Sequence, residues 1–173
     1  MLVSVFGGSR PPDNDYLTAY RLGKLLGEKG YSVLTGGYIG TMEAVSRGVA
    51  EHGGHVIGVT CGEIEKWRSI EPNQWVKEEK RFPMLYERMY ALISECDSAI
   101  VLPGGPGTLA ETAVMWTHLL IGAIQPKPLI LVGWQWKHLF DEFFHDFTEY
   151  IPKNQKSWLI FADSIEKAVN QLG

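Results

Sequence analysis

The sequence predicts an α/β protein of the Rossmann-like, doubly wound type, with a mostly parallel sheet and helices on both faces. Two observations lead to this prediction. Short apolar, β-rich runs alternate along the chain with stretches of helical periodicity, which is typical of βαβ units. Three glycine-rich turns each follow a predicted strand and precede a predicted helix. In open parallel sheets, such turns lie at the carboxyl ends of the strands, and ligands bind there.

Each predicted strand is a short apolar run that ends at a turn, as expected for strands buried in a parallel sheet. The predicted strands are residues 2–6, 31–35, 55–60, 98–102, 128–132 and 158–161. The stretch 63–81 is the least regular part of the chain, and a short extra strand at 75–77 is the one element we expect there.

Each predicted helix carries an apolar side, and some end at a glycine. The first places Leu22, Leu25 and Leu26 on one side and stops at Gly30. In the last, apolar residues fall at i, i+3, i+4 and i+7, which indicates an amphipathic helix. The predicted helices are residues 15–29, 40–52, 83–95, 108–124, 136–150 and 165–172.

Size and composition favour one domain over residues 1–173, because 45% hydrophobic and 21% charged residues are ordinary for a soluble globular protein. The formal net charge of -4 argues against a general nucleic-acid-binding protein. No apolar run is long enough to cross a bilayer, and the N-terminus lacks the basic flank of a signal peptide. We therefore expect a cytoplasmic protein without nucleic-acid or membrane partners.

Cysteine and histidine usage gives no sign of a metal site. Cys61 and Cys96 lack the CxxC spacing, which predicts two free thiols. The five histidines are scattered without ligand spacing. Lys127 lies between two prolines, an ordinary loop position, and no pyridoxal-phosphate lysine is recognisable. We expect neither a metal nor a cofactor.

The most informative segment runs from Pro103 to Glu111, between the predicted strand 98–102 and the predicted helix 108–124. Glycines let the backbone approach an anion, and the free amides at a helix start attract negative charge. Glu111 lies one turn into the helix, where a carboxylate beside a phosphate indicates a separate chemical role. Glycine turns after the first two strands point to the same edge of the sheet, and three such turns favour a phosphate-bearing ligand.

Two common nucleotide sites are excluded by their motifs. A P-loop needs Gly-Lys-Ser/Thr at the helix start, and no glycine turn of this chain has it. An NAD-type Rossmann site needs GxGxxG after the first strand and an acidic residue after the second. Here the first strand is followed by GGSRPP and the second ends in TGG, so neither condition is met.

Residues 103–111 read PGGPGTLAE and match PGGxGTxxE, the signature of the LOG family. Arg88 supplies the family's arginine in the preceding helix, and residues 36–44 resemble its GGGxxGLMGA element. From Val5 to about Val132, the chain thus resembles the cytokinin riboside 5'-monophosphate phosphoribohydrolases, long labelled lysine decarboxylases. It departs from them at Ser9-Arg10 and at Met89, like a divergent branch of the wider superfamily.

The resemblance implies hydrolysis of the N-glycosidic bond of AMP or a related purine monophosphate, N6-modified or not, to free base and ribose 5-phosphate. Glu111 would stabilise the positive charge that builds on the ribose and would activate water. Arg88 would orient Glu111 or contact the ligand, and an ion pair between them would keep Glu111 ionised. The residues implied to bind phosphate or line the cleft are Gly8, Ser9, Gly36, Gly37, Gly104, Gly105, Gly107 and Thr108.

The resemblance also implies a homodimer or a higher homo-oligomer whose partner is a small-molecule nucleotide. A second function stays open, because the superfamily includes carriers that bind nucleotides or molybdenum cofactor without an established hydrolysis. Taken singly, the residues also suit ordinary roles: Ser9 and Thr108 could be helix caps, and Arg10 could meet ligand or solvent. The sequence leaves the accepted base and the biological role open.

Overall fold

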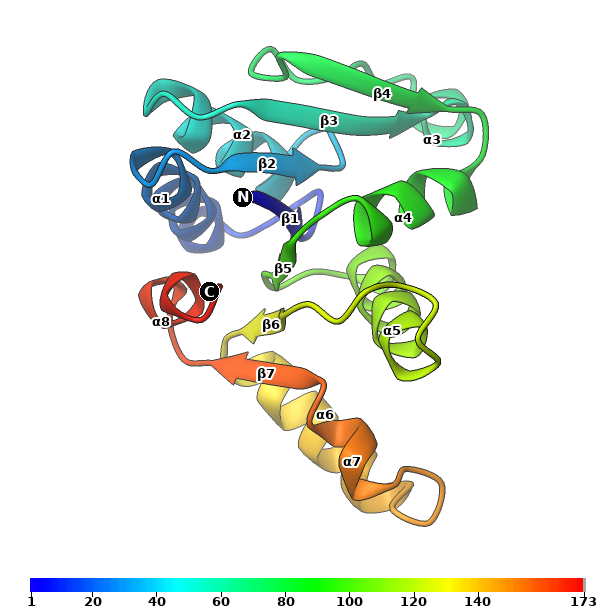
Figure 1. Ribbon diagram of the computed structural model, residues 1–173. Helices are drawn as coiled ribbons and strands as arrows, with labels where there is room; N and C mark the ends of the chain where they lie inside the picture. The colour runs from blue at the N-terminus through cyan, green and yellow to red at the C-terminus, as the bar shows by residue number, and fades with distance from the viewer. Residues whose placement is uncertain (173) are drawn as a thin grey trace.

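The computed structural model describes residues 1–172, and within them seven strands form one sheet in the order β4-β3-β2-β1-β5-β6-β7 (Figure 1). Every neighbouring pair in this sheet is parallel. The predicted α/β class with its parallel sheet is therefore confirmed. The strands are β1 (Leu2–Phe6), β2 (Ser32–Thr35), β3 (Val56–Cys61), β4 (Glu78–Phe82), β5 (Ser98–Val101), β6 (Leu129–Val132) and β7 (Leu159–Ala162).

Helices cover both faces of the sheet, with α1, α2 and α8 on one side and α4, α5 and α6 on the other (Figure 1). The helices are α1 (Asp13–Glu28), α2 (Thr41–Glu51), α3 (Gly62–Arg68), α4 (Leu85–Ser94), α5 (Pro106–Leu120), α6 (Trp134–Asp146), α7 (Lys153–Lys156) and α8 (Ile165–Asn170). None of those in the described part of the chain combines the length and apolar character needed to span a bilayer.

Two hydrophobic cores result, one on each face of the sheet, because side chains alternate along each strand. In β1, Val3 and Val5 are buried under α1, α2 and α8. Phe6 joins the opposite core, and Ser4 on that face donates a 2.5 Å hydrogen bond to the carbonyl of Leu92 in α4. Cys61 and Cys96 are both buried free thiols, as predicted.

The strand order reverses beside β1, which places the ends of β1 and β5 next to each other. The chain moves outward from β1 to β4 and then crosses to β5 on the other side of β1. The Gly8 amide donates a 3.2 Å hydrogen bond to the Pro103 carbonyl, so the two glycine turns that follow these strands are joined. Such a reversal is the usual ligand site of a doubly wound sheet.

The stretch between β3 and α4 differs from the sequence prediction. A seven-residue helix, α3, was not predicted, and the extra strand is β4 at Glu78–Phe82 rather than at 75–77. β4 is an edge strand paired only with β3, and its charged side chains reach solvent. It therefore lacks the apolar run by which buried strands are recognised.

Helix α5 begins at Pro106, two residues before the predicted start. Proline suits the first turn of a helix because its missing N–H would have no partner there. Glu111 therefore lies in the second turn of α5. The short helix α7 was not predicted either.

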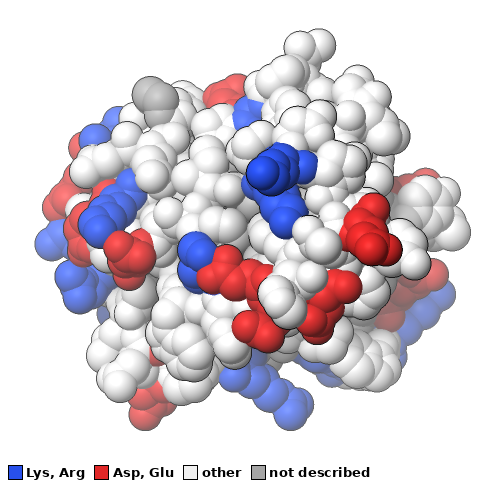
Figure 2. Space-filling model, turned by 90° about the horizontal axis from the view of Figure 1, so that it is seen from below, with Lys and Arg blue, Asp and Glu red and all other residues white. Residues whose placement is uncertain are grey.

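Charged side chains of both signs are interspersed on the face shown in Figure 2, which is the underside of the view in Figure 1. That face carries no continuous basic patch of the kind that binds nucleic acid.

Candidate functional site

A cavity of about 470 Å³ opens at the carboxyl ends of β1 and β5. Most of the residues singled out in the sequence meet there. Those that line it are Gly8, Ser9, Arg88, Gly105, Gly107, Thr108 and Glu111. They come from the turn after β1, from α4 and from the start of α5, so the reversal of strand order brings together segments that lie about a hundred residues apart.

Arg88 is a buried cation, with 5% of its surface exposed. Its guanidinium is held from three directions. Nε donates to the Val59 carbonyl at 2.7 Å, Nη2 donates to the Gly36 carbonyl at 3.3 Å, and Nη1 donates to Oε1 of Glu111 at 3.3 Å. Anchored on two backbone carbonyls, the guanidinium presents one remaining edge to the carboxylate in the cavity.

Gly36 and Gly37 are buried behind the cavity rather than at its surface. A Cβ on Gly36 would collide with Nη2 of Arg88, so only glycine lets the guanidinium reach this carbonyl. Gly37 has a φ of 78°, and its carbonyl accepts a 3.0 Å hydrogen bond from Nδ2 of Asn73. In the structure, this turn therefore holds Arg88 and the 69–77 loop in place.

Glu111 faces the cavity with a side chain that is 14% exposed. Burial raises the pKa of its carboxyl above the ordinary value, and the positive charge of Arg88 opposes that rise without cancelling it. The ion pair thus acts in the direction the sequence suggested, but desolvation is the larger effect. A carboxyl group in this setting exchanges protons closer to neutral pH than an exposed glutamate does.

The start of α5 forms one end of the cavity. Gly105 and Gly107 are exposed, and by helix geometry the amides of Gly107 and Thr108 have no intrahelical acceptor. A Cβ on Gly104 would collide with the Thr108 side chain and lie 2.9 Å from the Gly8 amide nitrogen. Glycine at 104 is therefore what allows the turns after β1 and β5 to touch.

Apolar walls of the cavity come mostly from residues that the sequence did not single out, namely Tyr38, Met42, Ile64, Trp67, Ile70 and Leu85. Met89, noted above as a departure from the family, also lines the cavity. The α3 segment supplies several of these residues, and it is tied to α4 because the Glu63 carboxylate accepts a 2.7 Å hydrogen bond from the Leu85 amide. The sequence did carry one sign of this wall. Trp67 and Arg68, an aromatic residue and a cation, are adjacent in an otherwise irregular stretch.

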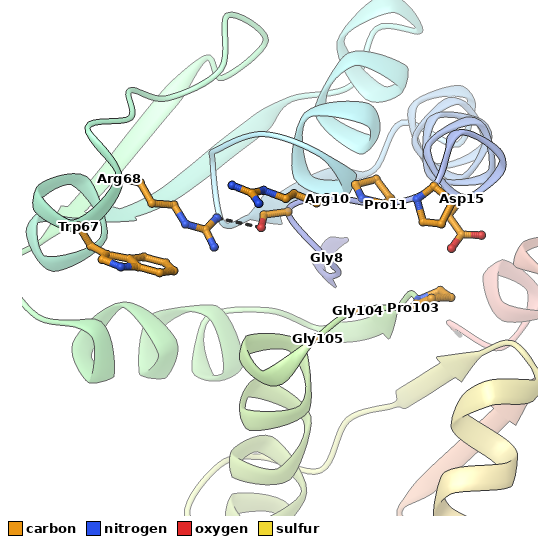
Figure 3. A pocket seen from close by; sticks show the side chains of 11 residues that line it. Gly8, Arg10, Pro11, Asp15, Trp67, Arg68, Pro103, Gly104 and Gly105 are labelled. Atoms are coloured by element: carbon orange, nitrogen blue, oxygen red, sulfur yellow. Dashed lines mark hydrogen bonds between the residues drawn. The ribbon is translucent and has the colours of Figure 1, made fainter.

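Arg68 continues this wall toward the turn after β1. Its Nη1 donates a 2.8 Å hydrogen bond to Oγ of Ser9, drawn as the dashed line in Figure 3. Ser9 is followed by Arg10, where a small side chain often stands in the family that the sequence resembles. Arg10, from the turn after β1, and Arg68, from α3, thus both lie beside the glycine turns.

Lys127 does not reach the cavity. Its Nζ donates to the carbonyls of Ser94, at 3.0 Å, and Cys96, so it closes the end of α4. Within residues 1–172, the cavity lining contains no lysine. The site therefore offers no amine for a Schiff base, which a pyridoxal-phosphate decarboxylase requires.

A family model described as "Possible lysine decarboxylase" matches residues 42–172. The chain belongs to this family. It is the family that the sequence resemblance indicates under the name LOG. Its descriptive name does not suit the lysine-free cavity just described.

Two relatives carry names that refer to nucleotides. A probable cytokinin riboside 5'-monophosphate phosphoribohydrolase of Oryza sativa subsp. japonica is 36% identical over 136 residues, which cover 76% of this chain and 53% of that protein. A pyrimidine/purine nucleotide 5'-monophosphate nucleosidase of Escherichia coli K12 is 32% identical over 143 residues, 76% of this chain and 31% of that protein. The chain therefore spans about half of the first relative and under a third of the second.

Among solved structures, the molybdenum cofactor binding protein from Rippkaea orientalis superposes with a TM-score of 0.77. The match covers 98% of this chain and 93% of that one at 24% identity. At this level of identity, the likeness establishes a shared fold.

Proposed function

We propose that this LOG-family protein hydrolyses the N-glycosidic bond of a nucleoside 5'-monophosphate, AMP or a related purine monophosphate, to free base and ribose 5-phosphate. The observation that carries the proposal is an ion pair between the buried Arg88 and the half-buried Glu111, beside a glycine-rich helix start in one cavity. The names of the rice and E. coli relatives support it.

The cavity has a suitable surface for each part of such a substrate. The 5'-phosphate fits the amides of Gly105, Gly107 and Thr108 together with the Ser9 hydroxyl. The apolar wall that includes Met42 and Ile64 suits a flat base. The ribose would then lie between the two, against Glu111.

The chemistry follows from that placement. As the bond between C1' and the base nitrogen breaks, its electron pair leaves with the base and positive charge builds on the ribose. The Glu111 carboxylate stabilises that charge and accepts a proton from the water that adds to C1'. The departing base takes up a proton from solvent, and Glu111 returns its proton to solvent, so the reaction consumes one water. Arg88 holds the carboxylate in place through its bond at 3.3 Å. Here Glu111 is the catalytic residue and Arg88 is the positioning residue.

The alternative is a carrier that binds a nucleotide or molybdenum cofactor in the same cleft without cleaving it. One observation favours it: a second cavity of about 570 Å³ adjoins the first, so the cleft can hold a ligand longer than a monophosphate. The fold likeness to a molybdenum cofactor binding protein is compatible with a carrier but shows the fold alone.

The decisive experiment is to incubate the purified protein with a panel of purine and pyrimidine 5'-monophosphates and to measure free base by chromatography. We expect base release from at least one purine monophosphate, and release slowed by about 10²- to 10⁴-fold in Glu111→Gln. Tight binding of intact ligand by wild type, detected by thermal shift without any product, would instead support the carrier. Absence of turnover over the whole panel would reject the hydrolase proposal.

A further inference from the structure

A second cavity of about 570 Å³ is lined by the turn after β1 and by the start of α1. It shares part of its wall with the first cavity, namely Gly8, Ser9, Trp67, Arg68 and Gly105. The residues that line only the second cavity are Arg10, Pro11, Pro12, Asp15, Pro103 and Gly104. The two cavities therefore meet where the phosphate of a bound nucleotide is proposed to lie.

Two arginines line the second cavity. Figure 3 shows Arg10 and Arg68 extending toward each other above the turns of Gly8, Gly104 and Gly105. Arg10 follows β1 and Arg68 ends α3, so they come from different elements. Asp15, the carboxylate of this cavity, lies at its other end in the same view.

Neither arginine has a carboxylate partner among residues 1–172, in contrast to Arg21, Arg47, Arg81 and Arg88, which all form ion pairs. Arg68 is supported instead by the Trp67 ring, 4.2 Å from its guanidinium carbon, and by the Ser9 hydroxyl. Two cations that line one cavity repel each other, and an anion bound between them removes that repulsion. The guanidinium group also matches phosphate geometry.

We infer that the second cavity is a subsite for a second phosphate group, bound between Arg10 and Arg68 and beside the exposed Gly104 and Gly105. Its ligand class is the nucleoside diphosphate, whose inner phosphate occupies the start of α5. The placement of the inner phosphate rests on the proposed function, whereas the subsite itself does not require that any bond be cleaved. The Ser9 hydroxyl, bonded to Arg68, stands at the boundary between the two phosphates.

Arg10 is the sharper probe of this subsite, because it lines the second cavity and not the first. The first test is calorimetric titration of the wild-type protein with inorganic pyrophosphate and with inorganic phosphate at one fixed ionic strength. We expect pyrophosphate to bind at least about tenfold more tightly than phosphate, the factor that one charge-assisted contact typically provides. Arg10→Gln should remove most of that difference and leave phosphate affinity unchanged within about twofold.

Lys66→Gln is the matched control, since it removes one exposed positive charge from α3 outside both cavities. It should keep the preference for pyrophosphate. Equal affinity of wild type for the two anions would overturn the subsite. An Arg10→Gln variant that binds both anions more weakly by the same factor would also overturn it. Arg10 would then contact the inner phosphate or act only through long-range electrostatic attraction.

The second test uses ADP and AMP with Glu111→Gln, in which turnover is suppressed. Tighter binding of ADP than AMP, lost in the Arg10→Gln, Glu111→Gln double variant, supports the diphosphate as ligand class. ADP binding no tighter than AMP would refute that class even where pyrophosphate binds. Failure of the wild type to release base from AMP would count against the hydrolase alone, because neither titration measures cleavage.

Discussion

Two arginine–glutamate pairs show how differently the same side chains behave in two regions of this molecule. Arg47 and Glu51 lie one turn apart on α2 at 3.0 Å, with side chains 45% and 29% exposed. Arg88 and Glu111 join α4 to α5 at 3.3 Å, with side chains 6% and 14% exposed. The first pair lies on the surface of one helix, whereas the second closes the wall of a cavity.

The carboxyl groups of the two pairs respond in opposite directions. Hydrogen bonds from Tyr20 and Arg47 lower the pKa of Glu51, as expected of a solvated ion pair. Burial raises the pKa of Glu111 despite the adjacent arginine. An ion pair therefore does not by itself fix the state of a carboxylate, and the buried glutamate is the one suited to exchange a proton with water.

The largest expected effect is on turnover. Glu111→Gln keeps the shape of the side chain but removes its ability to accept a proton, so kcat for the proposed base release should fall by about 10²- to 10⁴-fold. Binding of the monophosphate should persist, because the phosphate contacts are elsewhere. The same change at Glu51 should leave kcat and KM as in wild type. Similar losses from both substitutions would show that Glu111 has no special role.

The next effect concerns stability. Arg88→Ala leaves a buried carboxylate and two backbone carbonyls without their donor, which should lower the free energy of unfolding by about 3–5 kcal/mol. Arg47→Ala removes one partner of an exposed ion pair and should lower the free energy of unfolding far less. Added salt should make that small loss smaller still. Urea denaturation of the two variants measures the contrast. A loss from Arg47→Ala as large as that from Arg88→Ala would contradict the role given to burial.

A smaller effect is expected when Arg88 is displaced rather than removed. In Gly36→Ala, the new methyl group collides with Nη2 of Arg88 and with the Met42 sulfur, and such overpacking costs about 1–3 kcal/mol. Because the guanidinium must move, kcat should also fall. Gly62→Ala is the control, since its nearest neighbour would be the Pro83 carbonyl oxygen at an ordinary 3.5 Å. An active, fully stable Gly36→Ala protein would mean that Arg88 needs no support from this turn.

Comparison of the sequence predictions with the structure separates local from long-range information. The strands at the centre of the sheet were predictable because they are apolar runs that end at glycines, and β1 has the predicted bounds. The residues Arg88 and Glu111 were identifiable from a motif and a spacing. Their partners on the far side of Arg88, the carbonyls of Val59 and Gly36, could not be identified, since backbone acceptors leave no trace in side-chain identity.

The α3 wall shows the other limit. The 62–82 stretch is stabilised by single contacts with distant elements, such as Glu63 with the start of α4 and Arg68 with Ser9. Without an apolar period, neither the helix nor the edge strand β4 can be recognised locally. The α3 wall of the site thus came from the structure, whereas Arg88, Glu111 and the glycine turns were visible in the sequence.

The smallest expected effect concerns the acid limb of the pH profile, that is, the pH at which activity falls on acidification. The proposed reaction needs Glu111 as a carboxylate, and burial raises the pKa of this group. Activity should therefore fall on acidification at a higher pH than an ordinary glutamate would impose. The profile should be measured as kcat/KM, which reports ionisation of the ligand-free enzyme, and the contribution of the AMP phosphate is the same for wild type and variants. Arg88→Lys, which keeps a charge but loses the guanidinium fork, should move the limb further up, because less of the burial effect is opposed. Glu51→Gln should leave it in place. A limb at the pH of an exposed glutamate in wild type, or one that moves down in Arg88→Lys, would show that the titrating group is not the buried partner of Arg88.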